Sequence, residues 1–478
     1  MTLRQAGAGV LGLALLAAAG CKVGPNYHAP AMPAPPTYSD NGHNGNWAAA
    51  QPADAKDRGA WWQIYGDTEL NDLEQRCANA NQNIAAALHV YEQAHAIVRE
   101  NRASLYPEVS IGADVSRNRT SANKPLRVGG AASYWDFLIP LDISWEPDLW
   151  GGVRRQIESS AASAQASAAD LAGTRLSLQG LLAVTYLQLR GLDLQAQLLR
   201  STIDAYAQAV QLTQTRFVGG LATQSDVAQA QAQLEATRAE LIDLSVQRQQ
   251  FEHAIAVLTG VAATGFTVPQ KPLGDNPPSI PTGVPSELLE RRPDIAAAER
   301  RVAAANAQIG VAQAAFYPQV SLGATGAVES SAISTLFNSS SAEWSGGPSA
   351  SQILFDAGRR RARVDVAVAQ REQATALYRQ QVLSAFRDVE DQLSALRVLE
   401  QEADVQGRAV NAAQQSLNLA LIRYKGGIAT YLEVLTNQTI LLNDQRAAAA
   451  LVARRIVASA QLQIALGGGW NASQLPAN

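Results

Sequence analysis

Long hydrophobic runs are scarce in this sequence of 478 residues. Only residues 6–20, AGAGVLGLALLAAAG, form an uncharged, mostly apolar run, and it is too short to span a bilayer comfortably. A run of this length shortly after Arg4 is typical of the core of a signal peptide. Beyond residue 20 no apolar run reaches about 18 residues, so the sequence predicts no transmembrane helix. Any membrane crossing would have to be made of strands.

Cysteine is equally scarce, with Cys21 and Cys77 as its two occurrences. Small residues directly before Cys21 indicate a bacterial lipoprotein cleavage site, although Ala18 stands where that pattern usually has leucine. We expect a signal peptide over 1–20 and an acylated N-terminal segment over 21–67, with a covalent lipid on Cys21. The alternative is ordinary signal cleavage, which leaves Cys21 a plain thiol. With Cys21 acylated no intrachain disulfide is possible, so the fold does not depend on disulfides.

The sequence also lacks an excess of positive charge and any catalytic motif. Its formal net charge is −4, which offers no electrostatic case for binding nucleic acid. HExxH, CxxC, GxSxG and P-loop motifs are absent, and the five histidines are dispersed. The sequence therefore indicates no enzyme, no metal site and no cofactor apart from the covalent lipid on Cys21.

Proline is absent from two long stretches, Gly152 to Gly219 and Arg359 to Gly426. As a helix, each stretch would be on the order of 100 Å long, more than three times the thickness of a bilayer's hydrocarbon core. Most of each must therefore lie outside the membrane. Both stretches carry an apolar or aromatic residue at every seventh position, which predicts helices that coil around their neighbours. These residues are Leu182, Leu189, Ala196, Ile203, Val210 and Phe217, then Val389, Leu396, Ala403, Val410, Leu417 and Tyr424.

Two stretches of the chain, RFVGGLATQSDV at 216–227 and RYKGGIATYLEV at 423–434, are near copies. In each, we expect the glycine pair to close one helix and to turn the chain into a second, antiparallel helix. Further stretches that precede the two turns also match each other, which indicates that the sequence is internally duplicated. We predict a first repeat at 68–260, a proline-rich linker at 261–285, a second repeat at 286–467 and a tail at 468–478. The residues of the two turns are Phe217, Gly219, Gly220, Thr223, Gly426, Gly427 and Thr430.

Each repeat also contains two segments in which apolar and polar residues alternate, the pattern of a strand with one wet face. We predict strands at about 107–117 and 134–147, and at about 318–329 and 344–356. Trp135 and Trp145 bound an aliphatic row, which is typical of a lipid-facing strand with aromatic girdles. The opposite face carries acids that we expect to face a water-filled lumen, namely Asp114, Asp136, Asp142 and Glu146.

Four strands cannot close a barrel, and an open sheet edge in lipid leaves backbone groups unpaired at a cost of several kcal/mol each. Several copies must therefore pool their strands. Two copies would give eight strands and a filled interior, whereas three would give twelve strands and an aqueous bore. The acidic inner face favours a homotrimer with one twelve-stranded β-barrel, continued by a long α-helical barrel of coiled-coil hairpins. The predicted class is thus an internally duplicated α+β membrane protein.

The whole mature sequence resembles the TolC-like outer-membrane factors, in the NodT/OprM-like lipoprotein branch that serves tripartite RND efflux pumps. The resemblance rests on the order and spacing of several motifs. These are CKVGPNY (21–27), WWQIYGD (61–67), EPDLWGGVRR (146–155), ERRPDIAAAERR (290–301), FDAGRRR (355–361), ALGGGW (465–470), the Tyr-Pro pairs at 106–107 and 317–318, and both glycine turns.

This family implies a lipid-anchored channel in the cell outer membrane with a periplasmic α-barrel. It also implies a periplasmic adaptor (a membrane fusion protein) and an inner-membrane RND-type pump as partners, beside outer-membrane lipid. The channel would passively conduct small toxic compounds or drugs. The resemblance implies an iris gate at the periplasmic end, where Tyr424 latches onto Asp226, with Arg423 beside them.

Below that latch the family often has acidic rings and an apolar constriction. Leu432 matches the constriction and Glu433 the first ring, but Thr436 stands at the position of a second acid. Ala429 replaces an arginine found in some relatives. The charge filter is therefore expected to be weaker here.

Two other functions are compatible with parts of the pattern. One is the outer-membrane channel of a protein secretion system, and the other is a periplasmic coiled-coil adaptor or structural lipoprotein. The Trp-bounded apolar alternation at 135–145 favours a channel over an adaptor. The lipoprotein-like start and the ALGGGW ending favour drug efflux over protein secretion, by resemblance.

Overall fold

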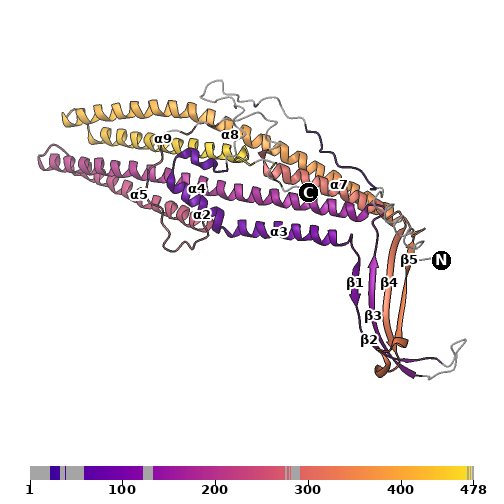
Figure 1. The fold of residues 1–478 in the computed structure, drawn as a ribbon. Coiled ribbons are helices and arrows are strands. Elements are labelled where there is room, and N and C mark those ends of the chain that lie inside the picture. Colours follow the sequence, from indigo (N-terminus) through magenta and orange to yellow (C-terminus); the bar gives the residue numbers. More distant parts are fainter. Residues whose placement is uncertain are drawn as a thin grey trace.

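The computed structural model of the chain describes residues 22–32, 38, 59–121, 133–274, 277–278, 280, 291–470, 473 and 475. Long helices run together in an elongated bundle, and a small antiparallel sheet leaves one end of that bundle at an angle (Figure 1). This is the α+β architecture that the sequence predicts. Cys21 and the predicted signal peptide at 1–20 lie outside the described residues, as do 275–276, 279 and 281–285 of the predicted linker.

The helices come in pairs of equal length, so the duplication seen in the sequence extends to the fold. A 3-10 helix, η2 (Trp61–Tyr65), and the helix α2 (Thr68–Ala80) precede the first of these pairs. The pairs are α3 (Gln82–Ala103) with α7 (Pro293–Ala314), 22 residues each, α4 (Gly152–Val218) with α8 (Arg359–Lys425), 67 each, and α5 (Gln224–Leu258) with α9 (Tyr431–Ala465), 35 each.

The seven-residue apolar rows of α4 and α8 lie mostly in the interior of the bundle. Leu182 and Leu189 of α4 and Val389 of α8 are fully buried. These rows hold the bundle together because each buried aliphatic side chain contributes about 1.5–3 kcal/mol of hydrophobic stabilisation. The rows end differently at the far tips, since Phe217 is 36% exposed whereas the equivalent Tyr424 is 3% exposed.

An aspartate turns the chain from sheet to helix at both junctions. The Asp148 carboxylate accepts hydrogen bonds from the backbone N–H groups of Val153 and Arg154, each at 2.9 Å, at the start of α4. Asp356 accepts equivalent bonds from Gly358 and Arg360, each at 3.2 Å, at the start of α8. These carboxylates satisfy amides that have no partner within the helix.

The sheet consists of β1 (Glu108–Ile111), β2 (Asp114–Arg119), β3 (Ser133–Trp145), β4 (Gln319–Ser330) and β5 (Ala342–Ser351). β1 and β2 lie end to end along β3, and β3, β4 and β5 follow as antiparallel neighbours. The edges of the sheet are therefore β5 on one side and the β1–β2 pair on the other.

Two details of the strands differ from the sequence prediction, and proline explains both. The strand predicted at about 107–117 is interrupted after Ile111, opposite Pro140 of β3, which has no N–H to donate to the ladder. β5 ends at Ser351 rather than near 356, because Ser351 pairs with Gln319 and the residue before it, Pro318, cannot donate either.

The N-terminal segment is fastened to the bundle close to the sheet. Arg155, fully buried in the first turn of α4, donates to the carbonyl oxygens of Val23 and Gly24, both at 2.9 Å. Val23 in turn donates its N–H to the carbonyl of Trp150 at 3.1 Å. Gly24 has a φ of +97°, and a Cβ there would lie 2.4 Å from the Cα of Gly310 in α7.

Among the described residues, no helix combines the length and apolar character needed to cross a bilayer.

Candidate functional site

The two glycine turns form the tips of the bundle, at the end farthest from the sheet (Figure 1). Each turn closes its long helix in the same way. Leu221 donates its N–H to the carbonyl of Arg216 at 2.7 Å, and Ile428 donates to Arg423 at 2.9 Å. The second glycine of each pair, Gly220 or Gly427, has a φ of +70° or +75°, a left-handed conformation that favours glycine. The first glycines, Gly219 and Gly426, have ordinary negative φ values.

The helices that follow the two turns begin differently. Thr223 and Asp226 form a capping box at the start of α5, in which the Asp226 carboxylate accepts from the Thr223 N–H at 2.8 Å and from its hydroxyl at 2.9 Å. Thr430, the equivalent residue before α9, makes no side-chain cap. The residue equivalent to Asp226 is Glu433, whose carboxylate instead lies 3.6 Å from the guanidinium of Arg423. In the duplicated tips the equivalent acids therefore differ in role: one caps a helix, and the other lies beside an arginine.

Tyr424 is buried at the end of α8, where three aromatic and cationic groups meet. Its ring packs edge-on against that of Tyr431, with ring centroids 5.6 Å apart. The guanidinium carbon of Arg216, from the first tip, lies 4.7 Å from the centre of the Tyr424 ring. Arg216 also donates to the carbonyl oxygen of Lys425 at 3.1 Å. This contact between the tips was not predicted from the sequence, although the match of Arg216 to Arg423 was visible there.

The hydrogen bond predicted between Tyr424 and Asp226 is not formed in this single chain. The hydroxyl of Tyr424 is buried and makes no hydrogen bond to any described residue. Both bonds from Thr223 reach one oxygen of Asp226, Oδ2. Burial, followed by the neighbouring phenols of Tyr424 and Tyr206 and last by the Asp226 carboxylate, raises the pKa of Tyr431, the ring next to Tyr424, to about 12. No hydrogen bond therefore joins the two predicted partners in the single chain.

The residues predicted to form the constriction lie on the first turns of α9. The side chain of Leu432 is exposed, and the hydroxyl of Thr436 donates to the Leu432 carbonyl at 2.9 Å, within the same helix. Glu433 lies beside them and is half-buried. Leu432 and Thr436 are four residues apart, so they share one face of α9.

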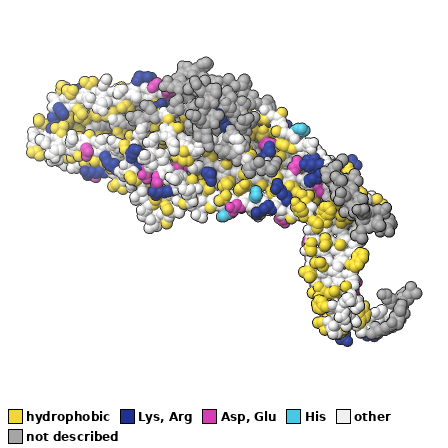
Figure 2. All heavy atoms as spheres, viewed as in Figure 1, with side chains coloured by type: hydrophobic (Ala, Val, Ile, Leu, Met, Phe, Trp, Pro, Cys, Tyr) yellow, Lys and Arg dark blue, Asp and Glu magenta, His cyan; other side chains and the backbone are white. Residues whose placement is uncertain are grey.

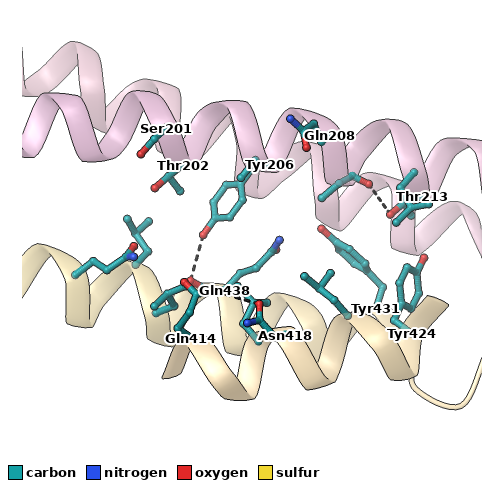
Figure 3. A pocket seen from close by; sticks show the side chains of 18 of the residues that line it. Ser201, Thr202, Tyr206, Gln208, Thr213, Gln414, Asn418, Tyr424, Tyr431 and Gln438 are labelled. Carbon is teal, nitrogen blue, oxygen red and sulfur yellow. Dashed lines mark hydrogen bonds between the residues drawn. The ribbon is translucent and has the colours of Figure 1, made fainter. Parts of the chain in front are cut away.

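A cavity of about 550 Å³ separates the two hairpins just behind the tips. Figure 3 shows Tyr206 and Thr213 of α4 on one side and Gln414, Asn418 and Tyr431 of α8 and α9 on the other. The hydroxyl of Tyr206 spans the gap and donates to the carbonyl of Gln438 at 3.2 Å. The first and second hairpins are therefore incompletely packed against each other near their tips.

The sheet has one apolar face, which is exposed in the single chain. Figure 2 shows hydrophobic side chains over most of the visible sheet. Cross-strand pairing places these side chains together, as in the pairs Val109–Ile143 and Ile111–Leu141. The exposed members of this face are Val109, Ile111, Val115, Trp135, Leu141, Ile143 and Trp344. A contiguous apolar surface of this kind marks contact with a membrane or a partner.

The opposite face of the sheet is polar, and the register places three of the predicted lumen acids on it. Asp142 pairs with Ser110 and Thr325, and it accepts a hydrogen bond from the Thr325 hydroxyl at 2.6 Å. Asp136 pairs with Ser116, and Asp114 pairs with Leu138 two positions further along β3. Glu146 lies just beyond β3, where it accepts from Gln319 at 2.7 Å. Among the described residues, no cluster of three or more histidines, cysteines or acids could hold a metal ion.

Comparison with known proteins relates this arrangement to a family. The family model described as outer membrane efflux protein matches residues 73–261 and 284–468. The chain is 33% identical over 433 residues to the pyoverdine export outer membrane protein OpmQ of Pseudomonas aeruginosa, which covers 90% of this chain and 91% of that protein. It is 32% identical over 457 residues to outer membrane protein OprJ of the same species, covering 94% and 93%.

Solved structures show the same likeness in three dimensions. A structure of the outer-membrane channel OprN superposes with a TM-score of 0.86 at 31% identity, covering 94% of this chain and 100% of that one. A structure of CusC superposes with a TM-score of 0.81 at 27% identity, with the same coverage. The likeness extends over helices and sheet together.

Proposed function

The chain belongs to the outer membrane efflux protein family and is an outer-membrane channel of an efflux system, and from this premise we propose that three copies share one twelve-stranded barrel. The observation that carries the proposal is the sheet with its two open edges and its single apolar face. β1 and β2 provide four and six residues on one edge, and β5 provides ten on the other. Edges of matched length can pair between neighbouring copies and leave no unpaired backbone in lipid.

Native mass measurement in mild detergent tests this assembly. We expect a trimer, together with ion conduction when the purified protein is added to planar bilayers. A conducting dimer would contradict the number of copies, and a monomer without conduction would contradict the shared barrel. A periplasmic adaptor or structural lipoprotein would leave the membrane once its lipid was removed, which fractionation of a Cys21→Ser variant would show.

We also propose that Cys21 carries the lipid anchor. Arg155 and Trp150 hold Val23 and Gly24 at the end of the bundle next to the sheet. Lys22, which pairs with Glu158, is also held there. An acyl chain on the preceding residue would therefore start near the membrane. Cys21→Ser should abolish labelling with radioactive palmitate, while the protein stays in the outer-membrane fraction because its barrel still spans the bilayer.

The tips form the gate in this proposal, with Tyr424 and Asp226 as its latch and Arg423 beside them. The buried Tyr424 hydroxyl is a donor without a partner among the described residues, and the Asp226 Oδ1 atom receives neither of the bonds from Thr223. A small shift of one tip towards the other, or towards a neighbouring copy, would join the two groups. A hydrogen bond to a charged group is worth about 1.5–3 kcal/mol, enough to favour the closed state without locking it.

Tyr424→Phe combined with Asp226→Ala should raise single-channel conductance in planar bilayers. Tyr431→Phe serves as the matched control, because it removes a neighbouring tyrosine hydroxyl that has no role in the latch. An unchanged conductance in the double variant would remove the latch and leave the channel itself intact.

An inner-membrane RND-type pump and a periplasmic adaptor complete the proposed system, and the channel conducts small toxic compounds passively. The relatives support a channel with little selectivity of its own. At similar identity they are named for pyoverdine export, for toluene efflux and for cation efflux. Substrate choice would then lie in the pump. Susceptibility profiling of a deletion strain, complemented with the wild-type chain, identifies the compounds; a strain with unchanged susceptibility to all toxic compounds would argue against this role.

A further inference from the structure

The arginines that precede the two glycine pairs occupy equivalent places in the duplicated tips but make different contacts. Arg423 stays within its own hairpin, where it lies 3.6 Å from Glu433. Arg216 leaves its hairpin and reaches the second one, donating to the carbonyl oxygen of Lys425 at 3.1 Å. Its guanidinium carbon lies 4.7 Å from the centre of the Tyr424 ring. The arginine of the second turn therefore makes its contact within its own hairpin, whereas the arginine of the first turn contacts the other hairpin.

The capping box explains why the two arginines differ. In the second tip Thr430 makes no side-chain cap, and Glu433 is available to Arg423. In the first tip the acid is Asp226, which is shorter by one methylene and is engaged by Thr223 through two hydrogen bonds. Among the described residues, the contacts of the Arg216 guanidinium are with the Lys425 carbonyl oxygen and the Tyr424 ring, and neither is a carboxylate. Its charge is thus free to act across the gap between the hairpins.

The acceptor of Arg216 is well suited to a cation. Lys425 is the last residue of α8, so its carbonyl oxygen has no partner within the helix and lies at the negative end of the helix dipole. The guanidinium of Arg216 lies over the Tyr424 ring, which also packs at a steep angle against the ring of Tyr431. Arg216 Nε is buried without a hydrogen-bond partner, which shows that part of the guanidinium is removed from water. Desolvation strengthens a cation–π contact.

We propose that Arg216 is a positioning residue of the gate: it holds the tip of the second hairpin against the tip of the first and so keeps the mouth narrow. This inference rests on the proposed role of the tips as a gate and names a residue outside the Tyr424–Asp226 latch. The hairpins are incompletely packed behind the tips, where the cavity of about 550 Å³ lies. Arg216 thus joins α4 directly to the end of α8, whereas the two hairpins otherwise meet mainly through α4 and α9.

The first test measures conductance in planar bilayers for three full-length variants. Arg216→Gln removes the charge and should raise the open fraction of the channel about tenfold, equivalent to ~1.4 kcal/mol at 25 °C. Arg216→Lys keeps a cation over the ring and should give an intermediate value. Arg238→Gln, the matched control, removes an arginine that pairs with Glu235 within α5 of the first hairpin, away from the tips, and should change the open fraction less than about twofold.

The second test measures the distance between the tips without using conduction. Spin labels at Leu221→Cys and Ile428→Cys, both on exposed side chains of the turns, report the separation of the hairpins within one chain. Cys77 is replaced by alanine, the acylated Cys21 is kept, and labelled chains are mixed with an excess of unlabelled ones. Arg216→Gln should lengthen and broaden the distance distribution by several ångströms, whereas Arg238→Gln, which breaks an ion pair inside α5, should leave it unchanged.

The proposal is overturned if Arg216→Gln leaves the distance distribution as in the wild type, or if Arg238→Gln changes it equally. A wild-type protein that does not conduct would contradict the proposed channel. The label distances would still decide whether Arg216 joins the hairpins.

Discussion

At the scale of single residues, the least expected feature is a carboxylic acid inside the core. Glu74 of α2 is fully buried beside Leu73 and Cys77, and neither of its carboxylate oxygens has a hydrogen-bond partner among the described residues. Burial raises the pKa of Glu74 to about 9. The folded protein therefore keeps a proton on Glu74 at neutral pH, which the unfolded chain releases above its ordinary pKa of about 4.3.

This linkage predicts a pH-dependent stability. Because the folded pKa is the higher one, the contribution of Glu74 to stability is greatest below about pH 4 and falls as the pH rises towards 9. Glu74→Gln removes the ionisable group and should stabilise the fold by about 2–4 kcal/mol at pH 7, with little gain at pH 4. Thermal unfolding in detergent at pH 4, 7 and 9 checks this. Asp72→Asn, at an exposed position of the same helix, should show no such trend. A gap between Glu74→Gln and the wild type that does not widen with pH would refute the buried neutral acid.

At the scale of elements, the two tips provide an internal comparison. Thr223 closes a capping box at the start of α5, whereas Thr430 makes no side-chain bond at the start of α9. Thr223→Ala should therefore destabilise the first turn of α5 by about 1 kcal/mol, and Thr430→Ala should have a much smaller effect. Hydrogen exchange reports this locally, as roughly fivefold faster exchange of the amides at 225–227 in the first variant. Equal acceleration at both helix starts would show that the difference between the caps is not real.

At the scale of the whole molecule, the two faces of the sheet decide how the chain meets the membrane. Leu141 lies on the apolar face and Ser144, three residues on, lies on the polar face. Leu141→Lys places a charge in lipid and should destabilise the assembled barrel by up to about 2–4 kcal/mol. Ser144→Lys, the same new side chain on the other face, should be tolerated and should change mainly the ion selectivity. Heat-modifiable mobility on gels and reversal potentials in planar bilayers measure the two effects. If Ser144→Lys were the more destabilising variant, the assignment of the faces would be reversed.

The sequence by itself determined the features that depend on local pattern. The absence of proline from 152–219 and 359–426 permits two helices of 67 residues, because nothing within them removes a backbone donor. The period-2 alternation at 134–147 predicts an amphipathic strand, and the near-identical turns predict the duplicated helical hairpins. Each of these signals comes from residues that are close together in the chain.

Only the tertiary structure decided how equivalent residues are used. Arg216 and Arg423 occupy matching positions in the sequence, yet Arg216 contacts the other hairpin and Arg423 does not. The partner of Arg216 lies about 200 residues away in the chain, and the sequence pattern does not specify the capping box that engages the acid of the first tip. The interruption of the first strand likewise depends on Pro140, which lies on the neighbouring strand. In the sequence Glu74 is indistinguishable from an exposed helical glutamate, and only the tertiary structure shows that its carboxylate is buried. Local periodicity fixes which elements form, whereas contacts between distant segments set the charge, burial and partners of each side chain.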